Sequence, residues 1–196
     1  MPEFLAVVQA RADDFARIPV GTDLLAAAFD RPASPGNLGS LIRSADDLGG
    51  SCVVVTGHAA DPYDPQCVRA TTGSLFSVPV LRAPSHREVR GWVDAQRAST
   101  PIAVIGADER GAADIWDVDL TEPVVLVIGN ETTGLTAAWR GACDLLVRIP
   151  MAGTASSLNA ANAGSVLLYE ASLRFATYPQ PAVSSTFVQV PPRSYL

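Results

Sequence analysis

Three segments of the sequence carry residue types that could surround and orient a small ligand. Each is rich in glycine, asparagine, serine and threonine, which permit unusual backbone angles and present short hydrogen-bonding groups. The segments are PGNLGSLIRSADDLGG (35–50), VIGNETTGL (127–135) and IPMAGTASSLNAANAGSVLLYEA (149–171). They are therefore the first candidates for a binding or catalytic site.

The charged and polar side chains of these segments each have an ordinary structural explanation. Asn37 is a natural helix N-cap, and Arg43 lies about 140° around a helix from the apolar Leu38, facing away from a buried stripe. Glu131 falls between a strand end and the next helix, where the helix dipole favours a carboxylate. Capping is also the default for the polar residues before the last apolar helix, Ser156, Ser157 and Asn159. Taken singly, none of them predicts a reaction.

The elements that would position these segments alternate between strands and helices. Short apolar runs rich in β-branched residues predict strands at Leu24–Phe29, Cys52–Thr56, Val78–Leu81, Ile102–Ile105, Val124–Ile128 and Leu145–Ile149. The pattern predicts an α/β fold, a six-stranded, mainly parallel sheet with helices on both faces. Ligands in such folds gather at the carboxyl ends of the strands. The segments that follow the first, fifth and sixth strands are therefore expected to meet there.

Apolar spacing and capping residues mark three helices. The first is closed by Gly49 and has one buried stripe, formed by Leu38, Leu41, Ile42, Ala45 and Leu48. Ser85 and Glu88 have the spacing of a capping box before a second helix. A third runs from Leu158 to about Ala176 and carries small residues that predict close packing on a neighbouring backbone, namely Ala160, Ala163, Gly164 and Ala171.

A chain of 196 residues is long enough for one α/β domain with a sizeable core. We expect this domain to span residues 23–177, after an N-terminal extension (1–22). The tail (178–196) contains four prolines, so it is predicted to be extended. No apolar run approaches the roughly 20 residues of a membrane span, and no secretory signal is evident. A cytoplasmic protein without membrane contact is expected.

The charge of the chain is unusual for a protein that would bind nucleic acid. The net charge is −6 and the isoelectric point is about 4.8, which repels a polyanion. All 14 basic residues are arginines, whose planar guanidinium groups suit bidentate phosphate contacts. RNA would therefore have to bind at a local group of basic side chains. The candidates are Arg11, Arg43, Arg69 and Arg140. The three cysteines are far apart and predict buried thiols, and no cluster with metal-ligand spacing is present, so no metal is expected.

Taken together, the three segments resemble the signature motifs of the SpoU (TrmH-like) RNA methyltransferases of the SPOUT superfamily, in the same order and at the expected separations. Between them, RATTGSLFSVPV (69–80) is similar to a further segment of these enzymes. The resemblance covers roughly residues 24–175. It implies a SPOUT fold with a deep C-terminal trefoil knot, a homodimer, and transfer of a methyl group from S-adenosyl-L-methionine to a ribose 2′-hydroxyl of rRNA or tRNA.

The resemblance also implies roles for individual residues. The catalytic set would be Asn37, Arg43, Glu131, Ser157 and Asn159. The cofactor would be held around Gly106, Ala107, Ile128, Gly129, Ile149, Met151, Ser157 and Leu158. Arg43 would either activate the hydroxyl as a base or stabilise the forming alkoxide electrostatically; the second is physically preferred because a guanidinium pKa exceeds about 12. Asn37 and Ser157 would orient the ribose and Arg43, whereas Glu131 and Asn159 would shape the loops.

Two other functions remain open at this stage. One is methylation of a small-molecule acceptor, which the acidic charge favours. The other is a non-catalytic RNA-binding module, which the intact candidate set disfavours.

Overall fold

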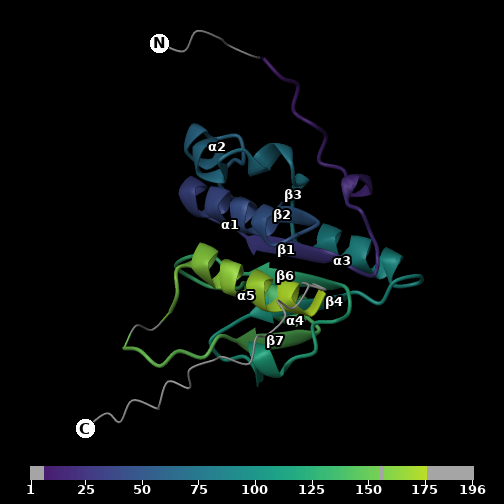
Figure 1. The fold of residues 1–196 in the computed structure, drawn as a ribbon, viewed down its shortest axis with the longest axis vertical. Helices are drawn as coiled ribbons and strands as arrows, with labels where there is room; N and C mark the ends of the chain where they lie inside the picture. The colour runs from purple at the N-terminus through teal and green to yellow at the C-terminus, as the bar shows by residue number, and fades with distance from the viewer. Residues whose placement is uncertain (1–6, 155–156, 176–196) are drawn as a thin grey trace, which may run out of the picture.

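The computed structural model describes residues 7–154 and 157–175, and this part of the chain is built on a single parallel sheet (Figure 1). The sheet has seven strands in the order β3-β2-β1-β6-β4-β7-β5. They are β1 (Leu25–Asp30), β2 (Cys52–Thr56), β3 (Val80–Ala83), β4 (Ala103–Ala107), β5 (Ala113–Asp114), β6 (Val124–Ile128) and β7 (Leu145–Arg148). Each pairing between these strands is parallel, so their carboxyl ends share one edge.

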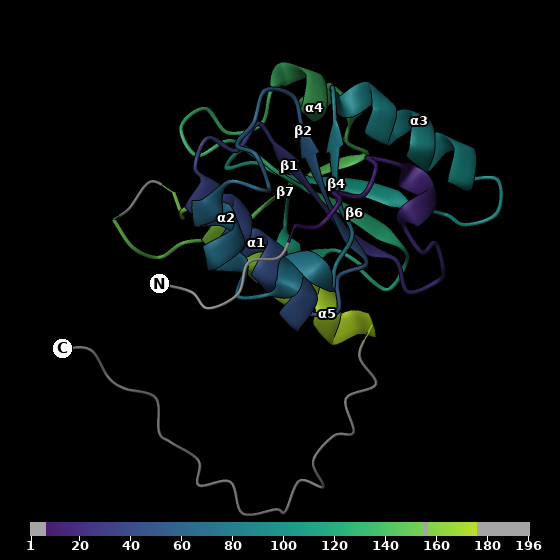
Figure 2. The ribbon, with the colours of Figure 1, turned by 90° about the horizontal axis from the view of Figure 1, so that it is seen from above.

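Helices cover both faces of the sheet, as predicted (Figure 2). On one face lie α1 (Pro35–Asp47), α2 (Pro65–Thr71) and α5 (Ala160–Phe175), and on the other lie α3 (His86–Gln96) and α4 (Ala137–Ala142). Alternate residues of β1 serve the two cores, with Ala27 in the first and Ala28 in the second. Three short 3-10 helices at Phe15–Arg17, Ser74–Phe76 and Ile115–Asp117 complete the described elements.

The prediction of six strands is wrong by one. β5 has only two residues, Ala113 and Asp114, and pairs with the outer side of β7. A strand of two residues shows no alternation of apolar and polar positions, so no pattern in the sequence marks it. The short helices α2 and α4 were also absent from the prediction. The six predicted strands are all present: β2 and β6 have the predicted bounds, and the ends of the other four differ by at most two residues.

The first helix begins three residues earlier than an Asn37 cap would require. Ser34 is the N-cap of α1, and its side-chain oxygen accepts the Asn37 N–H over 3.3 Å, while Pro35 occupies the first turn. The side chain of Asn37 therefore does not cap α1. Gly49 ends the helix region with a φ of +76°, as predicted.

The predicted close packing of the last helix is confirmed at Gly164. A Cβ atom on Gly164 would lie 2.4 Å from Leu41 Cδ1 of α1, so only glycine allows this approach of α5 to α1. The capping box of α3 is also confirmed, since Ser85 and Glu88 bond each other's backbone N–H reciprocally.

Part of the predicted N-terminal extension packs on the domain. Asp13 accepts hydrogen bonds from the backbone and guanidinium of Arg82 on β3, and Phe15 stacks on Trp92 of α3 with ring centroids 5.5 Å apart. The predicted tail lies outside the described residues. No described helix is long and apolar enough to cross a membrane.

The cysteines are free thiols, as expected. Cys52 and Cys67 are buried and Cys143 is partly buried, and burial raises the pKa of each thiol to about 12.

Candidate functional site

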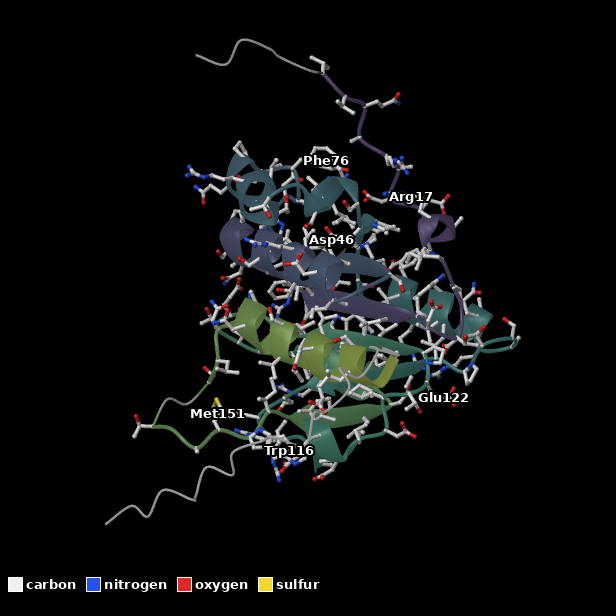
Figure 3. The ribbon with its side chains drawn as sticks, in the orientation of Figure 1. Arg17, Asp46, Phe76, Trp116, Glu122 and Met151 are labelled. Atoms are coloured by element: carbon white, nitrogen blue, oxygen red, sulfur yellow. The ribbon has the colours of Figure 1, made fainter. Side chains whose placement is uncertain are left out.

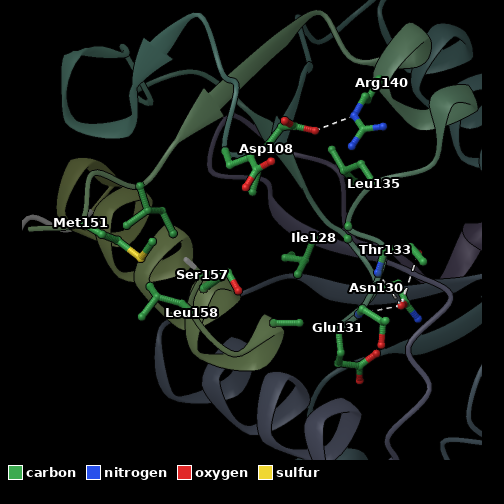
Figure 4. Close-up of a pocket in the computed structure, with 18 residues that line it drawn as sticks. Asp108, Ile128, Asn130, Glu131, Thr133, Leu135, Arg140, Met151, Ser157 and Leu158 are labelled. Carbon is green, nitrogen blue, oxygen red and sulfur yellow. Dashed lines mark hydrogen bonds and ion pairs between the residues drawn. The ribbon is translucent and has the colours of Figure 1, made fainter. Parts of the chain in front are cut away.

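A cavity of about 380 Å³ lies at the carboxyl ends of β4, β6 and β7. In Figure 4, Met151, Ser157 and Leu158 lie on one side of it, and Asp108, Arg140 and the segment from Asn130 to Leu135 lie on the other. Met151 belongs to the segment that joins β7 to α5 (Figure 3). The second and third candidate segments therefore do meet at the predicted edge of the sheet.

The first candidate segment joins the site through a chain of hydrogen bonds rather than by lining the cavity. Asn159 Nδ2 donates to Asn37 Oδ1 over 3.1 Å, and Asn37 Nδ2 donates to Glu131 Oε1 over 3.0 Å. The three residues come from the starts of α5 and α1 and from the loop after β6. Three of the five predicted catalytic residues are thus in direct contact.

Glu131 lies at the N-terminus of α1, where backbone donors converge on its carboxylate. Its oxygens accept the N–H groups of Ala33 over 3.0 Å and of Ser34 over 3.2 Å, in addition to the Asn37 amide. Desolvation opposes ionisation, but the hydrogen bonds outweigh it and hold the pKa of Glu131 below its ordinary value. The carboxylate is therefore ionised at neutral pH and acts as an acceptor that fixes the loop and Asn37.

Asn159 has a second task at the first turn of α5. Its Oδ1 accepts the N–H of Ala161 over 2.9 Å and that of Asn162 over 3.3 Å, which is the geometry of an N-cap. The same side chain therefore caps α5 and reaches Asn37. Ser157 and Leu158 precede this cap and line the cavity.

Arg43 does not line the cavity of its own chain, as far as the described residues define it. Its side chain is 55% exposed and pairs with Asp47 one turn along α1, with Nε 3.6 Å from Oδ2. The neighbouring Ser44 faces α5, its Oγ lying 2.7 Å from Ser165 Oγ. Arg43 is one residue earlier and so points outward from the sheet, on the solvent-facing stripe of α1.

Seven of the eight predicted cofactor residues line the cavity: Ala107, Ile128, Gly129, Ile149, Met151, Ser157 and Leu158. Gly106 does not. A Cβ atom there would lie 2.7 Å from Cys143 Sγ and 2.9 Å from Leu135 Cδ1, so this glycine serves packing behind the cavity. Gly129 has a similar steric need, because its Cβ would lie 2.4 Å from the backbone of Gly134 and Leu135.

Asp108 was not predicted to line the cavity, and Arg140 was predicted only as a contact for RNA. Arg140 Nε donates to Asp108 Oδ2, joining α4 to the end of β4 across the rim. Desolvation opposes ionisation of Asp108, but the Arg110 N–H and Arg140 outweigh it and lower its pKa. Its position directly after a parallel strand was the signal that could have found it.

The charges of the described lining suit a cationic ligand. Three carboxylates line the cavity, those of Asp108, Glu109 and Glu131, against one cation, Arg140. Apolar side chains such as Ile128, Ile149 and Leu158 supply a further part of the surface. A ligand with a flat apolar part and a positive charge fits this lining. No group of three or more His, Cys, Asp or Glu residues that could hold a metal occurs among the described residues.

A protein-family model described as "SpoU rRNA Methylase family" matches residues 25–169. The chain belongs to the SpoU rRNA methylase family. The match runs from the start of β1 well into α5, so it includes every residue of the hydrogen-bonded chain and of the cavity lining.

Individual relatives agree with this membership. The chain is 60% identical over 171 residues to a 23S rRNA (uridine(2479)-2′-O)-methyltransferase of Streptomyces viridochromogenes, covering 87% of this chain and 60% of that protein. It is 37% identical over 159 residues to an uncharacterized tRNA/rRNA methyltransferase of Mycobacterium tuberculosis, covering 76% of this chain and 48% of the relative. The chain thus spans about half to three fifths of these relatives' length.

Solved structures show the same fold. The SpoU methyltransferase AviRb of Streptomyces viridochromogenes, in complex with the cofactor AdoMet, is 59% identical with a TM-score of 0.81, over 84% of this chain and 62% of that one. An AdoMet-bound rRNA methyltransferase of Sinorhizobium meliloti is 38% identical with a TM-score of 0.74, over 82% and 60% of the two chains.

Proposed function

We propose that this protein is an S-adenosyl-L-methionine-dependent RNA methyltransferase that methylates a ribose 2′-hydroxyl, with 23S rRNA as the first substrate to test. The observation that carries the proposal is the convergence of the candidate segments on one cavity, tied together by the contacts of Asn159, Asn37 and Glu131. The name of the Streptomyces viridochromogenes relative supports both the reaction and the RNA class.

The residues of the cavity fit the proposed cofactor. Ile149, Met151 and Leu158 offer an apolar surface for the adenine, and the carboxylates of Asp108, Glu109 and Glu131 favour a positive charge. When bound, S-adenosyl-L-methionine supplies a methyl group on a sulfonium. The AdoMet-bound relatives support this assignment.

The chain's own residues have to align the hydroxyl and stabilise its developing charge. Asn37 is fixed by Glu131 and Asn159, so it can orient the ribose without reorganisation. Ser157 lies on the cavity wall and can act on the same ribose. Arg43 stabilises the forming alkoxide and grips the adjacent phosphate, since a guanidinium keeps its proton. Because Arg43 points away from its own cavity, this role requires a further element.

That element is a second copy of the chain. Three apolar side chains form an exposed stripe on α5 at helical spacing: Val166, Tyr169 and Leu173, with exposures of 39%, 55% and 46%. The stripe borders α1, which carries Arg43 on its outer face. A homodimer through this face would cover the stripe and bring Arg43 to the subunit interface, where it can serve the partner's site.

The strand order supports the knotted arrangement implied by the family. β7 follows β6 in sequence but inserts between β4 and β5, and α5 then returns to pack on α1, β1 and β6. We infer a trefoil knot formed by the chain after β6. We also infer a methyltransferase domain over residues 23–177, between an N-terminal extension (1–22) and a C-terminal tail (178–196). An rRNA substrate would be met in the cytoplasm.

The test is incubation with labelled S-adenosyl-L-methionine and unmodified 23S rRNA, followed by mapping of methylated riboses. One labelled 2′-oxygen supports the proposal. The net charge of −6 favours methylation of a small molecule as the second candidate. In that case the cofactor would bind and every RNA would stay unlabelled, whereas a non-catalytic module would label no acceptor at all.

A further inference from the structure

A buried carboxylate that the proposed reaction does not use lies next to the site. Asp30 is the last residue of β1 and is 3% exposed. Its Oδ2 accepts the backbone N–H of Thr136 over 2.9 Å, and its Oδ1 lies 3.4 Å from Nε of Arg31. Burial of a carboxylate costs free energy of desolvation, which only such partners offset. A buried aspartate at this position therefore indicates a structural or functional role.

The adjacent Arg31 is held in an unusual conformation. Its φ is +52°, in the left-handed region that disfavours side chains. Backbone bonds on both sides maintain it: the Arg31 N–H donates to Thr56 O over 3.0 Å, and its C=O accepts the Asn130 amide over 2.7 Å. Its guanidinium Nη2 donates to Thr133 Oγ1 over 3.3 Å. Backbone strain of this kind persists where the surrounding structure enforces it, often beside functional sites.

Three of these contacts, those to Asn130, Thr133 and Thr136, converge on the loop after β6, which we call the 130–136 loop. Asn130 and Thr133 are held by Arg31 near its start, and Thr136 is held by Asp30 at its end. Between these anchors lie Glu131, which orients Asn37, and most of one wall of the cavity. The position of that wall therefore depends on two residues that do not themselves line the cavity.

We propose that Asp30 and Arg31 are positioning residues that clamp the 130–136 loop so that the cavity is preformed for the cofactor. This inference rests on the proposed function. If the clamp is released, the loop samples other positions, and cofactor binding must select the competent one. Affinity for the cofactor should then fall even where the protein remains fully folded.

The experiment measures binding of S-adenosyl-L-methionine by calorimetry, together with thermal melting, for the whole chain and its variants. Asp30→Ala should raise Kd about tenfold or more, whereas Asp30→Asn keeps an oxygen acceptor for Thr136 and should stay within about threefold. Asp144→Ala is the control matched to Asp30→Ala. Asp144 also accepts a backbone N–H, from Val104 over 2.8 Å, and pairs with arginines, but outside the cavity lining. It should lower the melting temperature and leave Kd within about twofold.

Arg31→Gly separates positioning from stability. Glycine adopts a positive φ freely, so this variant should melt at or above the temperature of Arg31→Ala, while both lose the contacts to Asp30 and Thr133. Both should raise Kd about threefold or more. The clamp is overturned if Arg31→Gly and every folded Asp30 variant bind the cofactor like wild type, or if Asp144→Ala weakens binding as much as Asp30→Ala does. A wild-type chain that binds no cofactor would overturn the proposed function as well.

Discussion

The side-chain amide of Asn37 donates to Glu131 Oε1 over 3.0 Å, across 94 positions of sequence. This contact fixes the start of α1 against the loop after β6, and it assigns different tasks to the two residues. Glu131 is saturated with donors from Ala33, Ser34 and Asn37, so it orients and does not shuttle protons. Among the described contacts, the Asn37 amide keeps one N–H donor and one acceptor lone pair unused, and under the proposed function these act on the ribose.

Replacing Glu131 tests this division of tasks. Glu131→Gln keeps one acceptor oxygen but replaces the other with an NH2 group, which would face the N–H of Ala33 or of Ser34. We therefore expect a loss of about 1–2 kcal/mol in the free energy of unfolding. Activity should fall through kcat, since Asn37 is no longer fixed. Glu109→Gln is the control, because it removes another carboxylate of the cavity whose oxygens hold no backbone N–H among the described contacts. It should change stability by no more than about 0.5 kcal/mol. Chemical denaturation and steady-state kinetics measure both effects.

The lowered pKa of Glu131 predicts a stability change in acid. Its folded pKa lies below the ordinary value of 4.5. The stabilisation that the ionised Glu131 adds to the free energy of unfolding is therefore complete above pH 4.5 and is lost as the pH falls through the folded pKa. The pKa of Asp108 is also lowered, from its ordinary value of 3.8, so its contribution to stability is likewise lost in acid. Melting temperatures of wild type and Glu131→Gln should therefore differ at pH 7, and the difference should shrink as the pH falls below 4.5. A gap that stays constant down to pH 3 would contradict the assignment.

Close packing of α1 and α5 gives a prediction at Gly164. In Gly164→Ala the new Cβ would meet Leu41 Cδ1 at 2.4 Å, so the buried Leu41 side chain or α5 must shift, which should cost about 1–3 kcal/mol. A shift of α5 would also disturb the contact of Asn159 with Asn37. Gly91→Ala is the control, since a Cβ on this glycine of α3 meets nothing within 4 Å. Helix propensity should make that change neutral or stabilising by up to about 1 kcal/mol. If both variants unfold alike, the steric argument fails.

The elements that could be predicted are those whose cause is local. Ser85 and Glu88 cap α3 through neighbouring residues, and Gly49 ends α1 through its own φ, so both appear in the sequence. Gly164 was recognised as a packing residue because small side chains recur along α5. Ligands of parallel α/β folds bind at the carboxyl ends of the strands, and this rule correctly predicted that Glu131 and Ser157 lie at one edge of the sheet.

The features that could not be predicted depend on tertiary contacts. Ser34 replaces Asn37 as the cap because Asn37 is engaged by Glu131 and Asn159, far away in sequence. Gly106 follows the predicted fourth strand as a cofactor residue would, but it lies within β4. The side chains of Leu135, Cys143 and Leu146 fill the space that a Cβ would need there. The direction of Arg43 was correctly predicted to be away from the buried stripe. In the proposed homodimer, whether that direction meets an active site depends on the second chain, which no periodicity in the sequence describes.

The exposed stripe of α5 predicts the behaviour of interface variants. Tyr169→Asp places a charge in the middle of the stripe and should convert a dimer into a monomer, because an unpaired charge is costly in a buried apolar interface. Light scattering after gel filtration measures the change. Glu109→Gln, in the cavity lining, should leave the molar mass unchanged. A wild-type chain that is monomeric at micromolar concentration would contradict the proposed dimer.

Mixing two inactive variants decides which site Arg43 serves. Arg43→Ala lacks the proposed electrostatic group, and Leu158→Asp spoils the cavity without touching Arg43. If Arg43 acts in the partner's site, each mixed dimer has one site with an intact cavity and an intact Arg43 from the other chain. After co-refolding, methyl transfer to RNA should then recover to about a quarter of the wild-type rate, because half of the dimers are mixed and one site in each works. If Arg43 serves its own chain, the sites of a mixed dimer each lack one component, so the mixture stays inactive.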